Sequence, residues 1–288
     1  MRALLFTSVI LIASPTHALK TKSSPPRPAR PRPELLASTG KPLLPAPELV
    51  AEAIGTGLIT LLGTGTVSAA VYTGAQQGLW QIAVAWGAAV AVAAYTTAGI
   101  SGAHLNPAVT LALVVFKGFP AGKALAYALA QTIGATVAAV INYVTFSKAI
   151  ASFETTKEIV RGAAGSTASA PGVLGFGAHG TTLLSATALE ALQMGILMFV
   201  ILSATHQDSA APSGSACALI GLVVAVLISV YGPLTSAGFN PARAIGPCVV
   251  AAASGWGNEA FKGLTAYVFG PLVGGLGGAL AHRAIYEA

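Results

Sequence analysis

Long apolar stretches separated by short polar connections make up most of the chain beyond residue 47. No Asp, Glu, Lys or Arg occurs between Ala53 and Phe116, and a helix that crosses a membrane needs about 20 predominantly apolar residues. Charged and turn-forming residues divide the remaining sequence into further segments of similar length. We predict six membrane-spanning helices, at residues 49–72, 80–100, 122–147, 182–205, 214–233 and 262–285.

Two further apolar pieces, residues 106–116 and 240–253, are about half as long as a spanning helix. Both begin with the tripeptide Asn-Pro-Ala, in "SGAHLNPAV" and in "TSAGFNPAR". Asn is a favoured helix N-cap, and Pro is well tolerated at the first helical position. The pattern therefore predicts two short helices that begin inside the membrane. The Gly-, Ser- and Ala-rich residues 148–181 are predicted to form one long loop.

The two Asn-Pro-Ala segments belong to a larger internal repeat. An apolar segment that carries a Glu precedes each of them, with Glu52 in "AEAIGTG" and Glu190 in "ALEALQMG". We predict one channel domain over residues 48–288, with repeats at 48–147 and 182–286. Because each repeat crosses the membrane an odd number of times, the second copy is inverted, and its half-helix meets the first at the midplane. The predicted fold is an all-α membrane protein with six transmembrane helices and two re-entrant half-helices in an inverted 3+3 repeat.

The composition supports a membrane protein and excludes several other classes. Of the 288 residues, 54% are hydrophobic and only 8% are charged, whereas about a quarter of the residues in a soluble domain are charged. The net charge of +6 arises entirely from residues 1–41, so nothing in the channel domain indicates nucleic-acid binding. Cys217 and Cys248 lie in apolar segments without metal-ligand spacing. We therefore expect no cofactor, metal or disulfide, and the lipid bilayer as the surroundings.

Residues 1–47 are predicted to be a targeting leader followed by a disordered, basic, Pro-rich tail. Arg2 precedes an apolar run that is too short to span a membrane, and the following residues are rich in Ser, Pro, Lys and Arg. The first part is typical of a secretory signal, and the second of an organelle transit peptide. The combination predicts delivery to a plastid or other organelle membrane. A plain signal peptide with a basic tail is the alternative, and it would leave the protein in the plasma membrane.

The paired motif predicts a particular kind of pore. When an Asn oxygen caps a helix, the amide N–H₂ group remains able to donate, so Asn106 and Asn240 would offer donors at mid-membrane. Each half-helix also directs the positive end of its dipole, equivalent to roughly +0.5 charge, at the same point. Such a pore favours hydrogen-bond acceptors and repels cations. Glu52 and Glu190 are expected to be buried structural carboxylates that accept backbone N–H groups from the irregular loops.

Across residues 49–285 the sequence resembles the major intrinsic protein family, which comprises the aquaporins and glycerol facilitators. The residues that carry the resemblance are Glu52, "SGAHLNPAVT", Glu190, "GPLTSAGFNPARAIGP" and "FGPLVGG". The resemblance implies an aquaporin-like fold, a homotetramer of separately conducting monomers, and a pore lined at the midplane by the motif residues Asn106, Pro107, Ala108, Asn240, Pro241 and Ala242. It also implies that the His104 backbone carbonyl lines the pore.

The same resemblance implies a narrow selectivity filter at Trp86, Ile228, Ala237 and Arg243. Water-selective members usually have His and Phe where Ile228 and Trp86 stand, so this filter is expected to be wider and more apolar. The four residues also resemble those of plant nodulin-like intrinsic proteins. We therefore expect a passive channel for water and small neutral solutes, among them glycerol, urea, ammonia or metalloid acids, that excludes ions and protons.

Two alternatives from other classes follow from the same residues. Ser101 stands just before a predicted helix start, and His104, His179 or His206 could act as its base in an intramembrane serine hydrolase. That hypothesis leaves the second Asn-Pro-Ala motif unexplained. An inert structural membrane protein is the third interpretation.

Overall fold

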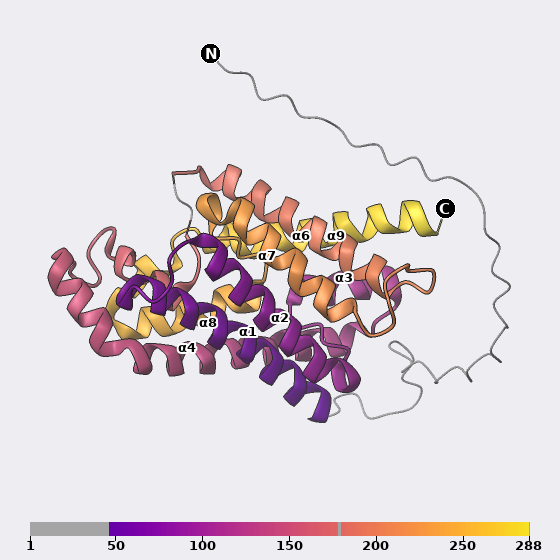
Figure 1. Cartoon of the computed structure of the whole chain (residues 1–288), viewed down its shortest axis with the longest axis horizontal. Helices are drawn as coiled ribbons and strands as arrows, with labels where there is room; N and C mark the ends of the chain where they lie inside the picture. The colour runs from indigo at the N-terminus through magenta and orange to yellow at the C-terminus, as the bar shows by residue number, and fades with distance from the viewer. Residues whose placement is uncertain (1–45, 178–179, 288) are drawn as a thin grey trace, which may run out of the picture. The chain divides into compact units, whose positions relative to one another are not determined.

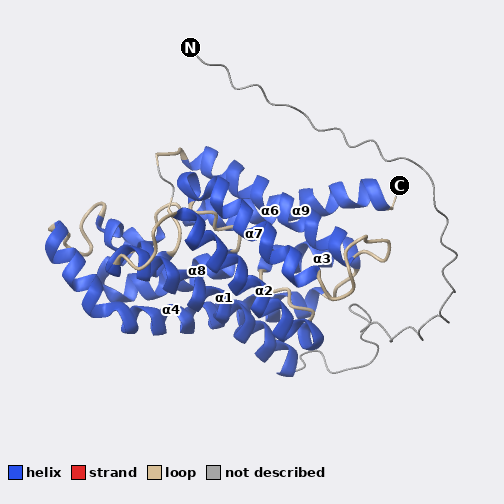
Figure 2. Ribbon diagram, viewed as in Figure 1, coloured by secondary structure: helices blue, strands red, loops and turns tan. Residues whose placement is uncertain are grey.

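The computed structural model describes residues 46–177 and 180–287, and every regular element in them is a helix (Figures 1 and 2). Nearly all of the predicted leader, residues 1–47, lies outside the described residues. Six helices are long and apolar enough to cross a membrane, which confirms the predicted number. They are α1 (Ala46–Thr73), α2 (Leu79–Ser101), α4 (Ala121–Lys157), α6 (Leu183–Thr205), α7 (Ala216–Thr235) and α9 (Leu264–Tyr286).

Two shorter helices begin directly after the Asn residues of the paired motif. These are α3 (Pro107–Lys117) and α8 (Pro241–Ala251). The Asn106 Oδ1 atom accepts the Ala108 N–H at 2.8 Å, and the Asn240 Oδ1 atom accepts the Ala242 N–H at 3.1 Å. Each Asn therefore caps its half-helix, as the sequence predicts. After α8, a π turn (Ala252–Trp256) and a 3₁₀ turn (Gly257–Phe261) lead to α9.

The packing of the helices follows the internal repeat. In the first half α1 packs against α4, and in the second half α6 packs against α9. Each half-helix packs against the last long helix of the opposite half, α3 against α9 and α8 against α4, while α2 lies against α7. In Figure 1, α3 and α8 lie toward opposite ends of the bundle. This exchange of partners is what an inverted 3+3 repeat requires.

Close helix contacts in the two halves depend on equivalent glycines. A Cβ atom on Gly134 of α4 would lie 1.9 Å from the Ala53 carbonyl oxygen of α1, and one on Gly274 of α9 would lie 2.0 Å from that of Ala191 on α6. No side chain fits at such distances, and small residues are what allow membrane helices to approach closely. The duplicated glycines thus fix the same tight helix pair twice.

The predicted long loop at residues 148–181 is wrong in part. Helix α4 continues to Lys157, and a 3₁₀ turn (Ser166–Ser169) and the short helix α5 (Pro171–Leu174) follow. The extension of α4 is held by packing, because Ile150 is fully buried and the Phe153 ring lies 5.7 Å from the Tyr72 ring. Charged residues ended the predicted span, but they do not end a helix whose apolar side chains still find partners.

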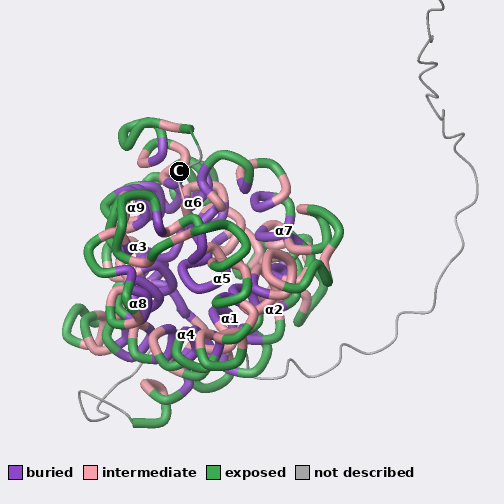
Figure 3. The backbone as a smooth tube through the Cα atoms, turned by 90° about the vertical axis from the view of Figure 1, so that its left-hand side faces the viewer, coloured by how far each residue is buried: buried purple, intermediate pink, exposed green. Residues whose placement is uncertain are grey.

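Buried residues gather inside the bundle and exposed ones on its outside (Figure 3). On α4, large exposed apolar side chains recur every four residues along one face, at Leu125, Leu129, Ile133 and Val137. Such a stripe suits contact with lipid. At one end, Lys123 pairs with Glu48 and Lys117 pairs with Glu287. Lys117 and Lys123 flank the short connection between α3 and α4. Their ion pairs therefore place the start of α1 and the end of α9 on the same side of the membrane, as an even number of crossings requires.

Candidate functional site

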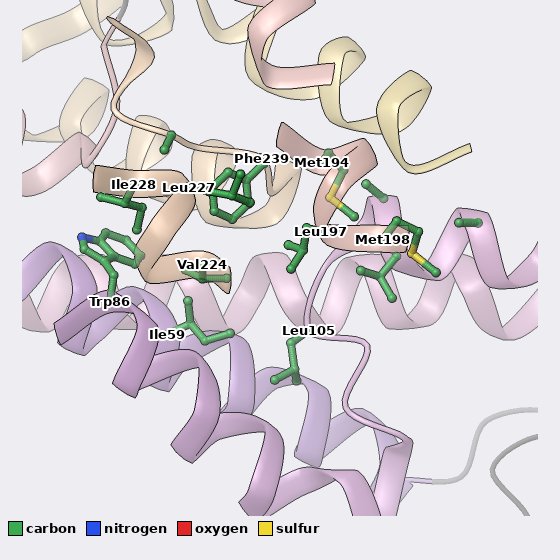
Figure 4. Packing of buried hydrophobic residues seen from close by; sticks show 14 of the residues in the cluster. Ile59, Trp86, Leu105, Met194, Leu197, Met198, Val224, Leu227, Ile228 and Phe239 are labelled. Carbon is green, nitrogen blue, oxygen red and sulfur yellow. The ribbon is translucent and has the colours of Figure 1, made fainter. Parts of the chain in front are cut away.

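A cavity of about 250 Å³ lies between the two halves of the bundle. At one end Trp86, Ile228 and Arg243 line it, and toward the other end Thr205 and Cys217 do so. Asn106 and Asn240 line its middle. Most of the remaining wall is aliphatic, and Figure 4 shows Val224, Ile59, Leu105 and Leu197 within this apolar packing. The cavity is therefore an apolar passage with polar groups at its centre and at one end.

The two Asn residues of the motif are joined across the middle of the bundle. The Asn106 Nδ2 group donates to the Phe239 carbonyl oxygen at 2.9 Å, and the Asn240 Nδ2 group donates to the Leu105 carbonyl oxygen at 2.8 Å. An amide N–H₂ has two hydrogens, so one is used in each of these bonds. The sequence predicted that both amide groups would remain able to donate at the midplane, but not that each would already bond the opposite loop. In the structure one N–H of each remains, and the Asn106 amide also donates to the Met194 sulfur, a weak acceptor, at 3.6 Å.

The two loops that lead to these Asn residues have unusual backbone. Five non-glycine residues in these loops have positive φ values: Ser236 at 60°, the pair Ala103 and Leu105, both at 51°, and the pair Ala237 at 49° and Phe239 at 29°. Such values are uncommon outside glycine and cost conformational energy. Because the two pairs occupy matching places before the two Asn residues, and Ser236 matches Gly102 with its φ of 85°, the same strained path is built twice.

The first loop is held by the carboxylate of Glu52, which is fully buried. One of its oxygens accepts the Ser101 hydroxyl at 2.6 Å and the His104 N–H at 2.9 Å. The other accepts the Leu105 N–H and the Gln131 side-chain amide, both at 2.7 Å. Buried polar groups need such partners, so Glu52 organises the loop rather than facing the cavity.

The second loop is held in the same way by Glu190, which is also fully buried. Its two oxygens accept the Gly238 N–H at 3.1 Å and the Phe239 N–H at 2.5 Å. The Thr235 hydroxyl also hydrogen-bonds this carboxylate. Thr235 thus occupies the place that Ser101 has in the first loop.

Arg243 is deeply buried, at 2% exposure, and its guanidinium lies 4.6 Å from the Trp86 ring. Its Nη2 atom donates to the Gly175 carbonyl oxygen at 2.6 Å, whereas its Nη1 atom has no hydrogen-bond partner among the described residues. Ile228 and Ala237 are buried in the same cluster as Trp86. The four predicted filter residues therefore meet at one end of the cavity, with a cation over an aromatic face and one of its donor atoms unpaired.

His104 is a packed residue. Its ring lies 4.6 Å from the Phe119 ring and 5.0 Å from the Tyr127 ring, and its Nδ1 atom is 3.2 Å from the Thr110 hydroxyl. The Thr110 hydroxyl in turn donates to the Asn106 carbonyl oxygen. The His104 ring therefore braces the start of α3.

The arrangement around Ser101 does not fit a hydrolase. The Ser101 hydroxyl donates to the Glu52 carboxylate, so its proton is committed to a structural acceptor rather than to His104. His206 lies beyond the end of α6, and His179 lies outside the described residues. In the part of the chain that the structure describes, no cluster of His, Cys, Asp or Glu could hold a metal ion.

Two site residues were missed by the sequence reasoning. Gln131 hydrogen-bonds both Glu52 and Thr110 from within α4, and its presence as a polar residue in a membrane span was a usable signal. Gly175 binds Arg243 from a loop far away in sequence. Nothing in the local sequence around Gly175 indicated that contact.

Six spanning helices in an inverted repeat, with two half-helices meeting beside a continuous cavity, define a membrane channel of the re-entrant half-helix class. A sequence model described as "Major intrinsic protein" matches residues 43–282. The chain belongs to the major intrinsic protein family. It is therefore a multi-pass integral membrane channel and not an enzyme.

Individual relatives agree with this assignment. The chain is 42% identical over 243 residues to the glycerol uptake facilitator protein of Escherichia coli strain K12, covering 82% of this chain and 86% of that protein. It is 41% identical over 240 residues to the propanediol uptake facilitator PduF of Salmonella typhimurium, covering 82% and 91%. The X-ray structure of the aquaglyceroporin from Plasmodium falciparum superposes with a TM-score of 0.70 at 23% identity, covering 83% and 96%. That structure shows the shared fold.

Proposed function

We propose that this protein is a passive channel for glycerol and similar small polyols, that it also admits water, and that it excludes ions and protons. The observation that carries this proposal is the Arg243 guanidinium, which is buried at the cavity wall beside Trp86 with its Nη1 atom unpaired among the described residues. A buried donor without a partner is costly unless something passing by can accept from it. A solute hydroxyl is such an acceptor.

Four residues form the selectivity filter in this proposal. Arg243 donates hydrogen bonds to solute oxygens, and the Trp86 ring contacts the C–H side of the solute. Ile228 supplies a second apolar wall, and the small Ala237 side chain leaves room for the solute. A polyol presents a polar edge and an apolar edge at once, so it matches a filter that is polar on one side only. Relatives at about 40% identity are glycerol and propanediol facilitators, and this supports the choice of polyols.

The junction of the half-helices acts as a second, less selective contact. The remaining N–H groups of Asn106 and Asn240 donate to a passing oxygen, while Pro107, Ala108, Pro241 and Ala242 start the two helices whose positive ends meet there. Two such ends disfavour cations. An ion would also lose its hydration in a passage that is largely apolar. We therefore expect solute flux without electrical conductance.

Stopped-flow light scattering of proteoliposomes tests the proposal. Wild-type protein should admit glycerol and water well above protein-free vesicles, without current in planar bilayers. Ile228→His places a polar ring in the filter and should lower glycerol flux relative to water by about tenfold. The control is Val226→Ala on the exposed face of α7, which should leave the ratio unchanged. Glycerol flux at the protein-free level in folded protein would refute the channel function proposed here.

Assembly and destination form the remaining part of the proposal. The channel domain, residues 48–288, assembles as a homotetramer whose monomers each conduct, as the family resemblance implies. The leader directs it to a plastid or other organelle membrane, with the plasma membrane as the alternative. Light scattering of the detergent-solubilised protein after size exclusion measures the oligomer. Microscopy of a C-terminally tagged chain, with and without residues 1–45, identifies the membrane.

A further inference from the structure

The connection between α4 and α6 reaches the pore at Gly175. The Gly175 carbonyl oxygen accepts the Nη2 donor of Arg243 at 2.6 Å. Gly175 has a φ of 66°, and a Cβ atom there would lie 2.7 Å from the Thr64 side chain. The carbonyl that orients Arg243 therefore sits on tightly fitted backbone, and its position depends on what holds the connection in place.

Arg161 holds the start of this connection with an unusual number of contacts. Its Nε and Nη2 atoms donate to the two carboxylate oxygens of Glu154 at 2.8 and 2.9 Å. Its Nη1 atom donates to the Tyr143 hydroxyl at 2.8 Å and to the Ser254 carbonyl oxygen at 2.9 Å. The guanidinium also lies 4.1 Å from the Trp256 ring. This one side chain thus joins the end of α4 to the segment after α8.

Further hydrogen bonds connect Arg161 to Gly175. The Ser169 hydroxyl donates to Glu154, and the Trp256 Nε1 atom lies 3.0 Å from the Ser169 hydroxyl oxygen. The Tyr72 hydroxyl donates to the Ser169 carbonyl oxygen at 2.8 Å. Helix α5 begins two residues later, at Pro171, and Gly175 directly follows its last residue, Leu174. We call Glu154, Arg161, Ser169 and Trp256 the outer clamp.

We propose that Arg161 is a positioning residue for the solute filter, because the outer clamp fixes the Gly175 carbonyl that orients the Arg243 guanidinium. The inference rests on the proposed function, in which Arg243 contacts the solute. Arg161 is not among the residues that line the cavity, so it acts through the loop and not by touching solute. The planar guanidinium fork suits this task, since it fixes two partners in one geometry.

Charge alone does not explain the clamp. The pKa of Arg161 is raised because its guanidinium hydrogen-bonds the Glu154 carboxylate, and the side chain stays charged. A Lys at this position would keep the charge and lose the fork, the Tyr143 and Ser254 bonds and the stacking on Trp256. The substitution Arg161→Lys therefore isolates geometry from charge.

The test measures glycerol and xylitol flux, together with water permeability, in proteoliposomes. Arg161→Lys should lower the ratio of glycerol to xylitol permeability by about threefold while water permeability stays near the wild-type value. Glu154→Gln, which breaks the clamp from its other side, should lower the ratio in the same direction and serves if Arg161→Lys does not fold. Lys157→Gln, an exposed position on α4, is the matched control and should leave the ratio unchanged.

A double-mutant cycle separates positioning from general loosening. In an Arg243→Val background there is no guanidinium to orient, so Arg161→Lys should cause no further change in the ratio. An equal change in both backgrounds, or an unchanged ratio in folded Arg161→Lys and Glu154→Gln, overturns the positioning role. Wild-type protein that passes no glycerol would instead refute the proposed function, and the positioning role with it.

Discussion

At the first Asn-Pro-Ala loop, the Glu52 carboxylate accepts four hydrogen bonds, and Gln131, Thr110 and His104 form a polar network around it. At the second loop, Glu190 binds the backbone in the same manner. The equivalent positions there are Gly238 for His104, Ala244 for Thr110 and Pro271 for Gln131, so this polar network has no counterpart. The second loop instead has Arg243 where the first has Val109.

This difference shows how a duplicated scaffold can divide its work. Both loops need a buried carboxylate, because both follow a strained path that leaves backbone N–H groups without helical partners. Apart from the Asn106 amide at the midplane, the polar side chains of the first loop bind one another and the Glu52 carboxylate. The second loop carries fewer of them and one charged group, whose Nη1 atom is unpaired among the described residues. Both copies thus supply a supporting carboxylate and an Asn amide at the midplane, but the charged solute contact proposed for the filter belongs to the second copy alone.

The largest effect is expected from removing the carboxylates. The Glu52 carboxylate accepts four donors, two on each oxygen, whereas Glu190 accepts three, the Gly238 and Phe239 N–H groups and the Thr235 hydroxyl, so Glu52→Gln leaves the larger number of interactions to be replaced. Hydrogen bonds to a charged group contribute about 1.5–3 kcal/mol each, so Glu52→Gln should be the more destabilising. Thermal unfolding of both purified variants in one detergent measures this. Equal midpoints would mean that the first loop is not the more tightly held of the two.

An intermediate effect, on solute selectivity, is expected from replacing the Arg243 solute contact of the second loop by the residue at the equivalent position of the first loop. Arg243→Val gives the second loop the residue that the first has, and it removes a charged donor whose hydrogen bonds contribute about 1.5–3 kcal/mol. The ratio of glycerol to xylitol permeability should fall about tenfold, since a tenfold change corresponds to about 1.4 kcal/mol. Val109→Ala in the first loop is the matched control and should change the ratio far less. A similar change in both variants would contradict the division of roles.

The smallest effect is expected from Thr110→Ala, which gives the first loop the Ala that the second has. The change removes the partner of the His104 ring and of the Gln131 amide, and it should lower the unfolding free energy by about 1–2 kcal/mol. The solute ratio should stay at the wild-type value. Thr132→Ala, where the hydroxyl only bonds the carbonyl of its own helix, is the control. A shifted ratio would show that the first loop also takes part in selection.

Most of the fold could be predicted from the sequence because a membrane imposes simple rules on length and polarity. The spans, the half-helices and their inverted repeat follow from apolar segment length and from two copies of one motif. The grouping of Trp86, Ile228, Ala237 and Arg243 also follows, once the family spacing is applied to this chain.

The rest depends on contacts between residues far apart in sequence. The extension of α4 to Lys157 depends on the burial of Ile150, and the contact of Gly175 with Arg243 depends on how a loop folds back over the bundle. The bonds between the two Asn-Pro-Ala loops were also unforeseen, because capping alone does not reveal where an amide hydrogen points. Local patterns carry no information on such partners.

The reciprocal bonds from Asn106 to the Phe239 carbonyl and from Asn240 to the Leu105 carbonyl have a consequence for biosynthesis. During translation the first half is made well before residue 239 exists, so its buried amide must wait in the bilayer without its final acceptor. Neither half can complete its midplane until the other has inserted. We therefore expect the nascent chain to pass through a late docking step in which both half-helices become fixed together.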